Sequence, residues 1–468
     1  MMQIVVIGAY GSAGVAVATE LADKGEVVDE EVKLTLVDDG DPGGGLCILR
    51  GCMPSKEVLS AGAHRYQARH DDRLVGSRPD VDLEHTVATK NEHISNFAAH
   101  RRSTVQELSE RDNVEFIHDT AQFVDDHTIR VGEREIEADY VVIATGSTPK
   151  IPELDGIDAV EFMTSADVLD ATTLPDSGIV MGFGYVGIEL VPYLVEAGGM
   201  DLTVVEHDDR PLDEADPPFG DELMSIYREE FDIEILTNTH ERAIESTNDG
   251  IRMLVDQDGS ERTIEAEKLF VFTGRQPELA GLGLEHTALE PDDDWVTDTM
   301  QARDDERTFV VGDVNGKEPI LHVAKEQGYR AAENILRHRD GRSLRPYENV
   351  THRVIFAGLG VYPIARIGHT ATSARTAGID HTVIDRQASD DGVFLTKDAA
   401  SGLARLIVSA DGTVIGYQGM HLHADVMAKT MQIVVERGMD VHEIPDRAYH
   451  PTTPEIIDGL LRAAKQKL

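Results

Sequence analysis

Cysteine is nearly absent from this sequence, whose 468 residues include only Cys47 and Cys52. Two thiols without a nearby histidine cannot close a zinc site, which takes four ligands. One bridge would stabilise a chain of this length little, so a structural disulfide and two unrelated buried thiols are the weaker alternatives. Two closely spaced thiols can instead pass two electrons to an external disulfide by thiolate exchange. The pair therefore predicts redox chemistry.

Basic residues are also scarce. The chain has 43 Lys and Arg against 86 Asp and Glu, which gives a formal net charge of -43. This excess repels nucleic acid and anionic membrane surfaces and argues against both as partners. The acids are spread through short runs, and molar salt would screen them because it shortens the Debye length to about 3 Å. We infer a halophilic source, with an ordinary acidic protein as the alternative.

Long hydrophobic runs are missing too. No run reaches the roughly 18 apolar residues of a membrane span. The apolar stretch 1–18 lacks a basic start and contains Gly8, Gly11 and Gly14, so a buried strand that turns into a helix explains it better than a signal sequence. We expect a soluble, cytoplasmic protein, and in that compartment a disulfide is usually catalytic.

The remaining sequence predicts two similar halves. In each half an apolar strand leads through a glycine-rich turn into a helix, and a second strand ends at an acid, Asp38 or Glu206. The expected segments are strands 3–7, 34–37, 178–181 and 202–205 and helices 15–22 and 188–197. Short strands between residues 120 and 143 predict a small meander. The length of the chain predicts two or three domains.

After about Leu344 this pattern stops. Strands 404–410 and 413–420 flank Asp411-Gly412, a strong hairpin signal, and a helix 424–437 follows. We place His421 and His423 in alternation on a strand and interpret both as structural. The predicted fold class is α/β, with two Rossmann-like dinucleotide-binding domains and a C-terminal α+β domain.

Two stretches carry a family resemblance. The first reads Gly44-Gly45-Leu46-Cys47-Ile48-Leu49-Arg50-Gly51-Cys52-Met53-Pro54-Ser55-Lys56, and it resembles the redox-active disulfide of the class I pyridine nucleotide-disulfide oxidoreductases. The second, His450-Pro451-Thr452-Thr453-Pro454-Glu455, resembles the acid/base stretch of that family. The resemblance runs from about Ile4 to about Leu460 and is strongest to the dihydrolipoamide dehydrogenases.

The resemblance implies an FAD enzyme built as a homodimer. Its FAD-binding domain would be discontinuous, residues 1–148 and 276–344, because an NAD-binding domain, residues 149–275, is inserted in it. Residues 345–468 would form the interface domain and make the dimer contact. The enzyme would move two electrons between NAD(H) and a thiol or disulfide.

The resemblance also assigns roles around the thiols. Cys52 would stand at a helix start against the flavin ring, where the positive helix end lowers the pKa of its thiol. Cys47 would exchange with the substrate. Lys56 would pair with Glu189 near the flavin N5, because burial of either charge without a partner is energetically unfavourable. The alternative is that both are surface residues.

The second stretch would supply proton transfer. An imidazole can take the proton of an incoming thiol or return it to a leaving one, and a carboxylate can fix its tautomer. The resemblance gives these tasks to His450 and Glu455, with the histidine reaching the thiol pair of the other subunit. The alternative is a surface histidine, one of the 19 in the chain.

The second glycine turn suits NAD. Gly182, Gly184 and Gly187 follow a strand and open a helix, so the backbone can approach a pyrophosphate at the positive helix end. Glu206 at the end of the next strand suits the two hydroxyls of an adenosine ribose, whereas NADP-specific relatives generally place Arg there. NAD is favoured, but Arg210 stands close by and NADP is not excluded.

The first glycine turn departs from the pattern. Counted from Gly8, Tyr10 and Ala13 take the places of the second and third glycines, while Gly11 and Gly14 fall one residue later. The order of strand, turn, helix and acid is still that of an FAD adenosine site. The alternative is a Rossmann-like half that has lost its ligand.

The resemblance extends to further cofactor contacts, and no metal site is expected. The implied FAD-binding residues are Gly8, Gly11, Ser12, Ala13, Asp38, Asp39, Gly45, Lys56, Thr145, Gly146, Gly312, Asp313 and Leu321. The implied NAD-binding residues are Gly182, Gly184, Gly187, Glu206 and Gly274.

Two departures leave the substrate open. The stretch Phe356–Pro363 is longer than its counterpart in typical dihydrolipoamide dehydrogenases, and Tyr449 and Pro454 differ from the common pattern. A lipoyl group is the first candidate substrate. The alternative substrates are a glutathione-like disulfide and bis-gamma-glutamylcystine. The alternative from another functional class is a non-catalytic nucleotide-binding redox sensor. A mercuric reductase is disfavoured because the chain ends without the extra cysteine pair of those enzymes.

Overall fold

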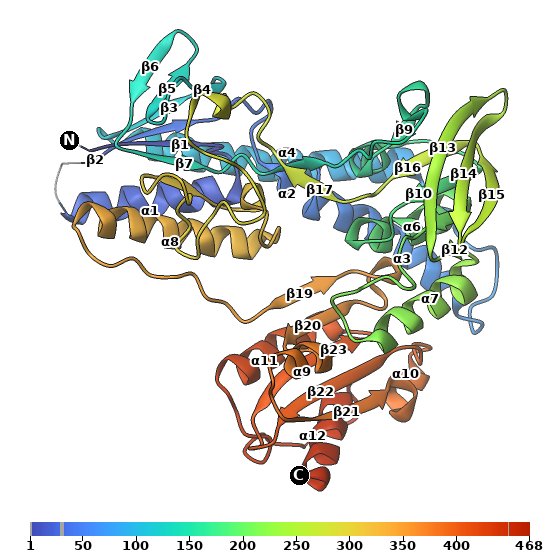
Figure 1. Cartoon of the computed structure of the whole chain (residues 1–468). Coiled ribbons are helices and arrows are strands. Elements are labelled where there is room, and N and C mark those ends of the chain that lie inside the picture. The colour runs from blue at the N-terminus through green and yellow to red at the C-terminus, as the bar shows by residue number, and fades with distance from the viewer. Residues whose placement is uncertain (1, 29–31, 448) are drawn as a thin grey trace. The chain divides into compact units, whose positions relative to one another are not determined.

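The computed structural model describes residues 2–28, 32–447 and 449–468. The chain forms two compact units (Figure 1). Unit 1 comprises Met1–Pro54, Thr89–Lys150 and Arg275–Glu348, and unit 2 comprises Ser55–Ala88, Ile151–Gly274 and Asn349–Leu468. Each unit has its own sheets and hydrophobic clusters.

Unit 1 is built on a parallel sheet of five strands in the order β18-β7-β1-β2-β3. Its strands are β1 (Met2–Ile7), β2 (Val32–Val37), β3 (Val114–Ile117), β7 (Tyr140–Ile143) and β18 (Thr308–Val310). They are rich in buried Val, Ile and Leu, as expected for a parallel sheet covered on both faces. Four helices belong to this region: α1 (Ser12–Val28), α2 (Leu46–Leu49), α4 (Leu83–Ser109) and α8 (Leu321–Arg339).

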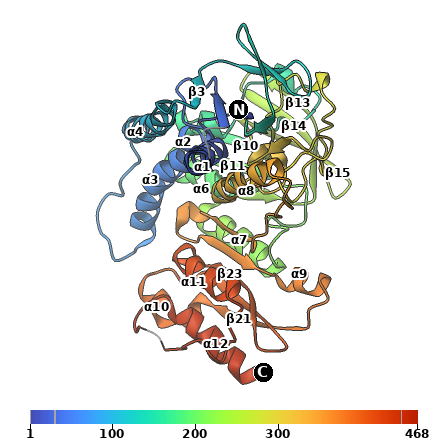
Figure 2. The same cartoon turned by 90° about the vertical axis from the view of Figure 1, so that its left-hand side faces the viewer.

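Helices α1 and α8 lie side by side in both views (Figure 1, Figure 2). Gly328 permits this close approach, because a Cβ added there would stand 2.7 Å from the carbonyl oxygen of Ala13. The packing fixes the start of α1, and with it the first glycine turn.

Two small sheets complete unit 1. The expected meander is an antiparallel sheet of β4 (Ala121–Phe123), β5 (Thr128–Val131) and β6 (Arg134–Glu137). Its Phe123, Ile129 and Val131 pack against Val5 and Val141 of the parallel sheet. Strand β8 (Ser147–Pro149) pairs antiparallel with β17 (Arg275–Pro277).

Unit 2 contains a second parallel sheet of five strands in the order β12-β11-β10-β16-β9. The strands are β9 (Phe162–Met163), β10 (Ser177–Met181), β11 (Asp201–Val205), β12 (Glu234–Leu236) and β16 (Lys268–Val271). An antiparallel sheet joins β13 (Thr239–Thr247), β14 (Gly250–Gln257) and β15 (Ser260–Ala266). The helices are α5 (Ser165–Asp170), α6 (Tyr185–Gly198), α7 (Pro217–Phe231) and α3 (Cys52–His70), of which residues 52–54 belong to unit 1.

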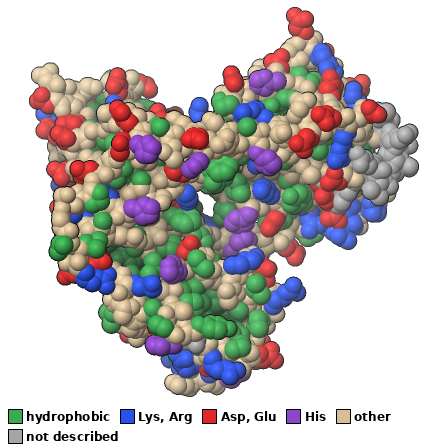
Figure 3. Space-filling view, turned by 180° about the vertical axis from the view of Figure 1, so that it is seen from behind, with side chains coloured by type: hydrophobic (Ala, Val, Ile, Leu, Met, Phe, Trp, Pro, Cys, Tyr) green, Lys and Arg blue, Asp and Glu red, His purple; other side chains and the backbone are tan. Residues whose placement is uncertain are grey.

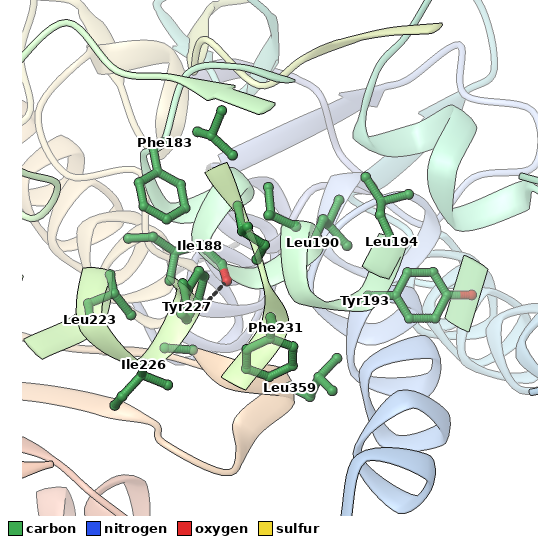
Figure 4. Packing of buried hydrophobic residues seen from close by; sticks show 14 of the residues in the cluster. Phe183, Ile188, Leu190, Tyr193, Leu194, Leu223, Ile226, Tyr227, Phe231 and Leu359 are labelled. Atoms are coloured by element: carbon green, nitrogen blue, oxygen red, sulfur yellow. Dashed lines mark hydrogen bonds between the residues drawn. The ribbon is translucent and has the colours of Figure 1, made fainter. Parts of the chain in front are cut away.

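The largest core cluster of unit 2 holds α6, α7 and α3 together. Figure 4 shows Phe183, Ile188, Tyr227 and Leu359 gathered in it, with the Tyr227 hydroxyl donating to the Ile188 carbonyl. Helix α3 contributes Val58, Leu59 and Tyr66 to the same cluster. The helix that begins at the second cysteine is therefore anchored by apolar packing along its length.

The C-terminal part of unit 2 is an α+β layer. Its antiparallel sheet has the order β19-β20-β23-β22-β21, with β19 (His352–Ile355), β20 (Ile364–Gly368), β21 (His381–Gln387), β22 (Leu403–Ser409) and β23 (Val414–Met420). Its helices are α9 (Ala371–Thr376), α10 (Gly392–Thr396), α11 (Ala424–Glu436) and α12 (Glu455–Lys467). The placement of His421 and His423 on a strand is wrong, because β23 ends at Met420 and His423 has φ +70 directly before α11.

The predicted fold class is confirmed, with two doubly wound parallel sheets and a C-terminal α+β layer. The three-domain boundaries remain a prediction. The division into units assigns residues 55–88 to unit 2. Acidic side chains are scattered over the face drawn in Figure 3. Within the described residues, no helix is long and apolar enough to cross a membrane.

Candidate active site

The two cysteines lie at neighbouring helix starts. Cys47 is half-buried in the short helix α2, and exposed Cys52 is the first residue of α3. Both are reduced thiols, and the Cys47 side chain hydrogen-bonds with that of Cys52. This hydrogen bond, followed by burial, raises the pKa of the Cys47 thiol. Cys52 occupies the positive end of a helix whose first turn holds no acid, a position that favours a thiolate.

The glycines before Cys47 bring its loop against the first glycine turn. Gly45 has φ +75, and a Cβ added there would stand 3.1 Å from the Gly11 Cα and from the Tyr10 carbonyl oxygen. At Gly43 an added Cβ would enter the ring of Tyr10 at 2.2 Å. The loop therefore requires glycine to reach this position.

The first glycine turn is a regular turn lengthened by one residue. Helix α1 begins directly after Gly11, and a Cβ at Gly14 would stand 2.2 Å from the Gly8 carbonyl oxygen. The structure therefore places Gly11 and Gly14 in the second and third glycine positions, and the register that puts Tyr10 and Ala13 there is wrong.

Asp38 holds this longer turn in place. One carboxylate oxygen accepts from the Tyr10 N–H at 2.8 Å, and the other accepts from the Gly40 N–H at 2.9 Å. Burial, as the largest cause, raises the pKa of Asp38. A carboxylate has about four lone-pair sites, so acceptor capacity remains for ribose hydroxyls. The carboxylate of the neighbouring Asp39 accepts instead from Thr120 Oγ1 at 3.0 Å.

Further predicted FAD-binding residues gather in unit 1. A Cβ added at Gly312, which has φ +79, would stand 3.1 Å from the Cβ of Ala13 at the start of α1. Asp313 accepts from Ser147 Oγ at 2.8 Å, close to Gly146 in sequence. Thr145 Oγ1 donates to the carbonyl of Glu278 at 2.6 Å, Ser12 opens α1 and Leu321 opens α8.

These residues fit an FAD. The first turn of α1 contains no acid, so its N–H groups can face a pyrophosphate. Gly146 has φ +82 and open space where a Cβ would stand, which leaves room for a bound group beside the turn.

The second glycine turn fits NAD more closely. A Cβ at Gly182 would stand 2.7 Å from the Phe272 carbonyl oxygen, and one at Gly187 would stand 2.6 Å from the Gly182 carbonyl oxygen. At Gly184, by contrast, no atom lies within 4 Å of an added Cβ. A tight turn, an open middle glycine and a closely packed last glycine are what pyrophosphate binding requires. Gly274 has φ +94 and is also open.

Glu206, the acid that follows the second glycine turn, resembles Asp38 in its contacts. The Glu206 carboxylate accepts from the backbone N–H groups of Asp208, at 3.0 Å, and Phe183. Burial raises the pKa of Glu206 above its ordinary value. Arg210 is paired with Asp209 at 2.9 Å and with Asp221 at 3.1 Å, so two carboxylates already neutralise it.

Lys56 and Glu189 meet as the resemblance implies. The Lys56 ammonium donates to both carboxylate oxygens of Glu189, at 2.8 and 2.7 Å. Phe356 supports the pair, because its N–H donates to Glu189 at 3.1 Å and its ring centroid lies 4.4 Å from the ammonium. Phe356 opens the stretch that departs from the family pattern.

His450 and Glu455 also meet. The Nδ1 atom of His450 lies 3.0 Å from Glu455 Oε1, which also accepts from the Thr452 N–H at 3.0 Å. The His450 side chain is 81% exposed and its carboxylate partner 19%. An oriented and accessible imidazole is suited to proton transfer with an external group.

Sequence reasoning missed two arginines of α4. Arg101 donates to the Tyr10 carbonyl at 3.0 Å, and Arg102 donates to the Gly43 carbonyl at 3.1 Å. No motif surrounds them, and their contacts lie 91 and 59 residues away in sequence. His423 was interpreted as structural, and its Nδ1 lies 3.0 Å from Thr453 Oγ1 in the acid/base stretch.

Comparison with known proteins identifies the family. The family described as pyridine nucleotide-disulphide oxidoreductase matches residues 2–328, and its dimerisation domain matches residues 353–460. The chain belongs to this family. It is 29% identical to dihydrolipoyl dehydrogenase 2 of Haloarcula marismortui, over 92% of this chain and 91% of that protein.

Two further relatives agree in length. The dihydrolipoyl dehydrogenase of Halobacterium salinarum is 29% identical over 99% of this chain and 96% of its own. The crystal structure of LpdA from Mycobacterium tuberculosis has a TM-score of 0.83, with 22% identity and 99% of each chain covered, which shows the same fold.

Membership confirms the predicted class of enzyme. The chain is a flavoprotein disulfide oxidoreductase that uses FAD and a pyridine nucleotide. A non-catalytic redox sensor is thereby set aside. Relatives from halophilic archaea are among the matches, and this chain has an acidic composition.

Proposed function

We propose that this chain is an NAD-linked dihydrolipoamide dehydrogenase-type enzyme that works as a homodimer. The observation that carries the proposal is the thiol pair: the chain's two cysteines hydrogen-bond, and the second opens a helix. The length and names of its relatives support a lipoyl substrate, and the dimerisation domain supports a homodimer. The pairing of Arg210 with two acids supports NAD over NADP.

In the reducing direction the thiols do the exchange chemistry. The Cys47 thiolate attacks one sulfur of the substrate disulfide, and the leaving thiolate takes a proton from His450 of the partner subunit. The Cys52 thiolate then attacks the Cys47 sulfur, releases the second substrate sulfur as a thiolate, which takes its proton from solvent, and closes the Cys47–Cys52 disulfide. Two electrons have passed to the substrate. The reverse sequence oxidises a dithiol.

The remaining residues hold the cofactors and charges. The two glycine turns, with Asp38 and Glu206, would hold FAD and NAD at helix starts. Bound FAD would supply the two-electron link between pyridine nucleotide and thiol pair. Glu189 compensates the charge of Lys56, so that the ammonium can remain in a partly buried position. Glu455 fixes the tautomer of His450.

A substrate panel tests the proposal. Holoenzyme in high salt is assayed with NADH and lipoamide, glutathione disulfide or bis-gamma-glutamylcystine, and then with NADPH in place of NADH. We expect turnover with lipoamide, with NADH preferred, and no turnover in the Cys47→Ser variant. Preferred reduction of another disulfide would contradict the substrate assignment, and NADPH preference would contradict the cofactor assignment.

A further inference from the structure

Helix α4 directs two consecutive arginines at two different loops of unit 1. Arg101 donates to the carbonyl of Tyr10 in the glycine turn, and Arg102 donates to the carbonyl of Gly43 in the loop that leads to Cys47. Both side chains are half-buried. They resemble each other in burial and in the kind of bond they make, so Arg102 is a matched control for Arg101.

Arg101 has no acidic partner among the residues that the structure describes. Its bond partner is a neutral carbonyl, and burial lowers the pKa of its guanidinium. A Cys47 thiolate is the neighbouring charge that would raise this pKa again. A half-buried cation is costly without a nearby negative charge. In this part of unit 1 that negative charge can come from a cysteine thiolate.

The backbone fixes this arrangement. The Tyr10 carbonyl oxygen that receives Arg101 also lies 3.1 Å from the position of a Cβ on Gly45, two residues before Cys47. Farther up the helix, Ala98 lies 3.3 Å from the corresponding position on Gly44. One face of α4 therefore packs directly on the glycines that precede the thiol.

We propose that Arg101 is the counter-ion of the Cys47 thiolate. The proposal rests on the proposed function, in which Cys47 is the thiol that attacks the substrate. The Arg101 guanidinium lowers the energy of the negatively charged Cys47 sulfur before attack and remains protonated throughout. The electrons move from sulfur to substrate, and the leaving thiolate takes its proton from His450 of the partner subunit. Cys52 of α3 acts on Cys47 more strongly than Arg101 does, and it opposes ionisation when both thiols are reduced.

Alkylation of a single thiol tests the proposal. In a Cys52→Ser holoenzyme, Cys47 is the one remaining cysteine, and its iodoacetamide reaction rate between about pH 5 and pH 10 reports its thiolate fraction. Arg101→Gln and Arg101→Met remove the charge, so the test does not depend on one variant folding. Arg101→Lys keeps the charge, and Arg102→Gln removes the neighbouring arginine as a matched control.

The expected result is a shift in the pH profile. Both neutral variants of Arg101 should move the midpoint upward by about one pH unit and slow the reaction about tenfold at neutral pH. Arg101→Lys should retain most of the reactivity, and Arg102→Gln should keep the parental midpoint. Equal pH profiles of alkylation for Arg101→Gln and Arg102→Gln would overturn the proposal. Neutral Arg101 variants that lose bound FAD but keep the parental pH profile would overturn it too.

This result is independent of the substrate assignment. Alkylation needs neither NADH nor a disulfide, so a shifted midpoint would stand even if lipoamide were not turned over. Conversely, lipoamide turnover by the wild type would support the proposed function even if Arg101 did not affect the midpoint.

Discussion

The two glycine turns share one architecture but differ in length. In both, the last glycine packs on the carbonyl of the first: an added Cβ would stand 2.2 Å away at Gly14 and 2.6 Å away at Gly187. In both, a buried aromatic residue before the second glycine, Tyr10 or Phe183, donates its N–H to the acid of the next strand. One extra residue in the first turn is thus accommodated while these contacts are kept.

The difference lies at the second glycine. Gly184 is open, whereas a Cβ at Gly11 would stand 3.1 Å from the Gly8 carbonyl oxygen and 3.3 Å from that of Ala144. The longer turn also presents the Tyr10 carbonyl to Arg101. The first turn is therefore connected to the thiol loop and to α4, while the second leaves open space at its middle glycine. This difference is what a resident cofactor at the first turn and an exchanging one at the second would require.

The largest effects should come from the last glycines. Gly14→Ala forces a side chain against backbone, which costs about 3 kcal/mol, or roughly a hundredfold in binding. We expect this variant to lose FAD. Gly187→Ala should keep its FAD and lose reduction by NADH. Absorbance measures the bound FAD of each variant, and stopped-flow kinetics measure its reduction by NADH. The same defect in both variants would show that the two turns do not differ in the cofactor they serve.

Tyr10→Ala should come next. Its ring is 8% exposed, lies against Gly43 and has its centroid 5.1 Å from that of Phe116. Loss of a buried aromatic ring costs about 3 kcal/mol. The melting temperature and FAD affinity of Tyr10→Ala should both fall, while Tyr10→Phe keeps the ring and should match the wild type. If Tyr10→Phe lost as much as Tyr10→Ala, the hydroxyl and not the ring would stabilise the turn.

Alanine substitutions at the second glycine of each turn should affect different properties, NADH binding in one turn and fold stability in the other. Gly184→Ala enters empty space, so the melting temperature should not change, but the methyl group would stand where a pyrophosphate approaches and raise the KM for NADH about tenfold. Gly11→Ala should instead destabilise the fold by about 1 kcal/mol because its neighbours must move. Thermal melts and steady-state kinetics distinguish the two. A lower melting temperature for Gly184→Ala would contradict the open geometry.

The smallest expected effect is a pH dependence of NADH affinity. Burial raises the pKa of Glu206 above 4.5, so the folded protein holds this proton at a pH where the unfolded chain has lost it. Stability from this group is present below pH 4.5 and is lost as the pH rises through the raised value. NADH binding should depend on pH in the opposite sense, since it is the Glu206 carboxylate that would accept hydrogen bonds from the ribose hydroxyls.

Affinity should therefore fall as the pH is lowered toward this raised value, by a factor of about three to ten. Equilibrium titration of NADH at several pH values measures the effect. Glu206→Gln should bind NADH more weakly at neutral pH and lose the pH dependence. A pH dependence that survives in Glu206→Gln would assign it to another group.

Much of this architecture could be predicted from periodicity and turn residues. The strands before Gly8 and Gly182 and the hairpin at Asp411-Gly412 follow from local signals that the fold does not override, whereas the helix start at Cys52 was implied by the family resemblance. The register of the first turn could not be predicted, because an inserted residue can be placed only once the backbone contacts of Gly14 are known.

The side chains that sequence reasoning missed act over long separations. Arg101 and Tyr10 meet because α4 packs on the thiol loop, and nothing local to either residue signals it. His421, which we interpret as structural, lies beyond the end of the strand and is fully buried, where burial lowers its pKa to about 4. Contacts set by tertiary packing are the part that sequence patterns do not contain.

If Cys47 and Cys52 carry electrons between NADH and a disulfide, reduction by NADH must generate thiols at this pair. Anaerobic titration of the oxidised holoenzyme with NADH, with thiols counted by a chromogenic disulfide reagent, tests it directly. We expect two new reactive thiols for each equivalent of NADH, together with a long-wavelength absorbance band that Cys52→Ser lacks. NADH consumption without any gain in thiols would contradict it.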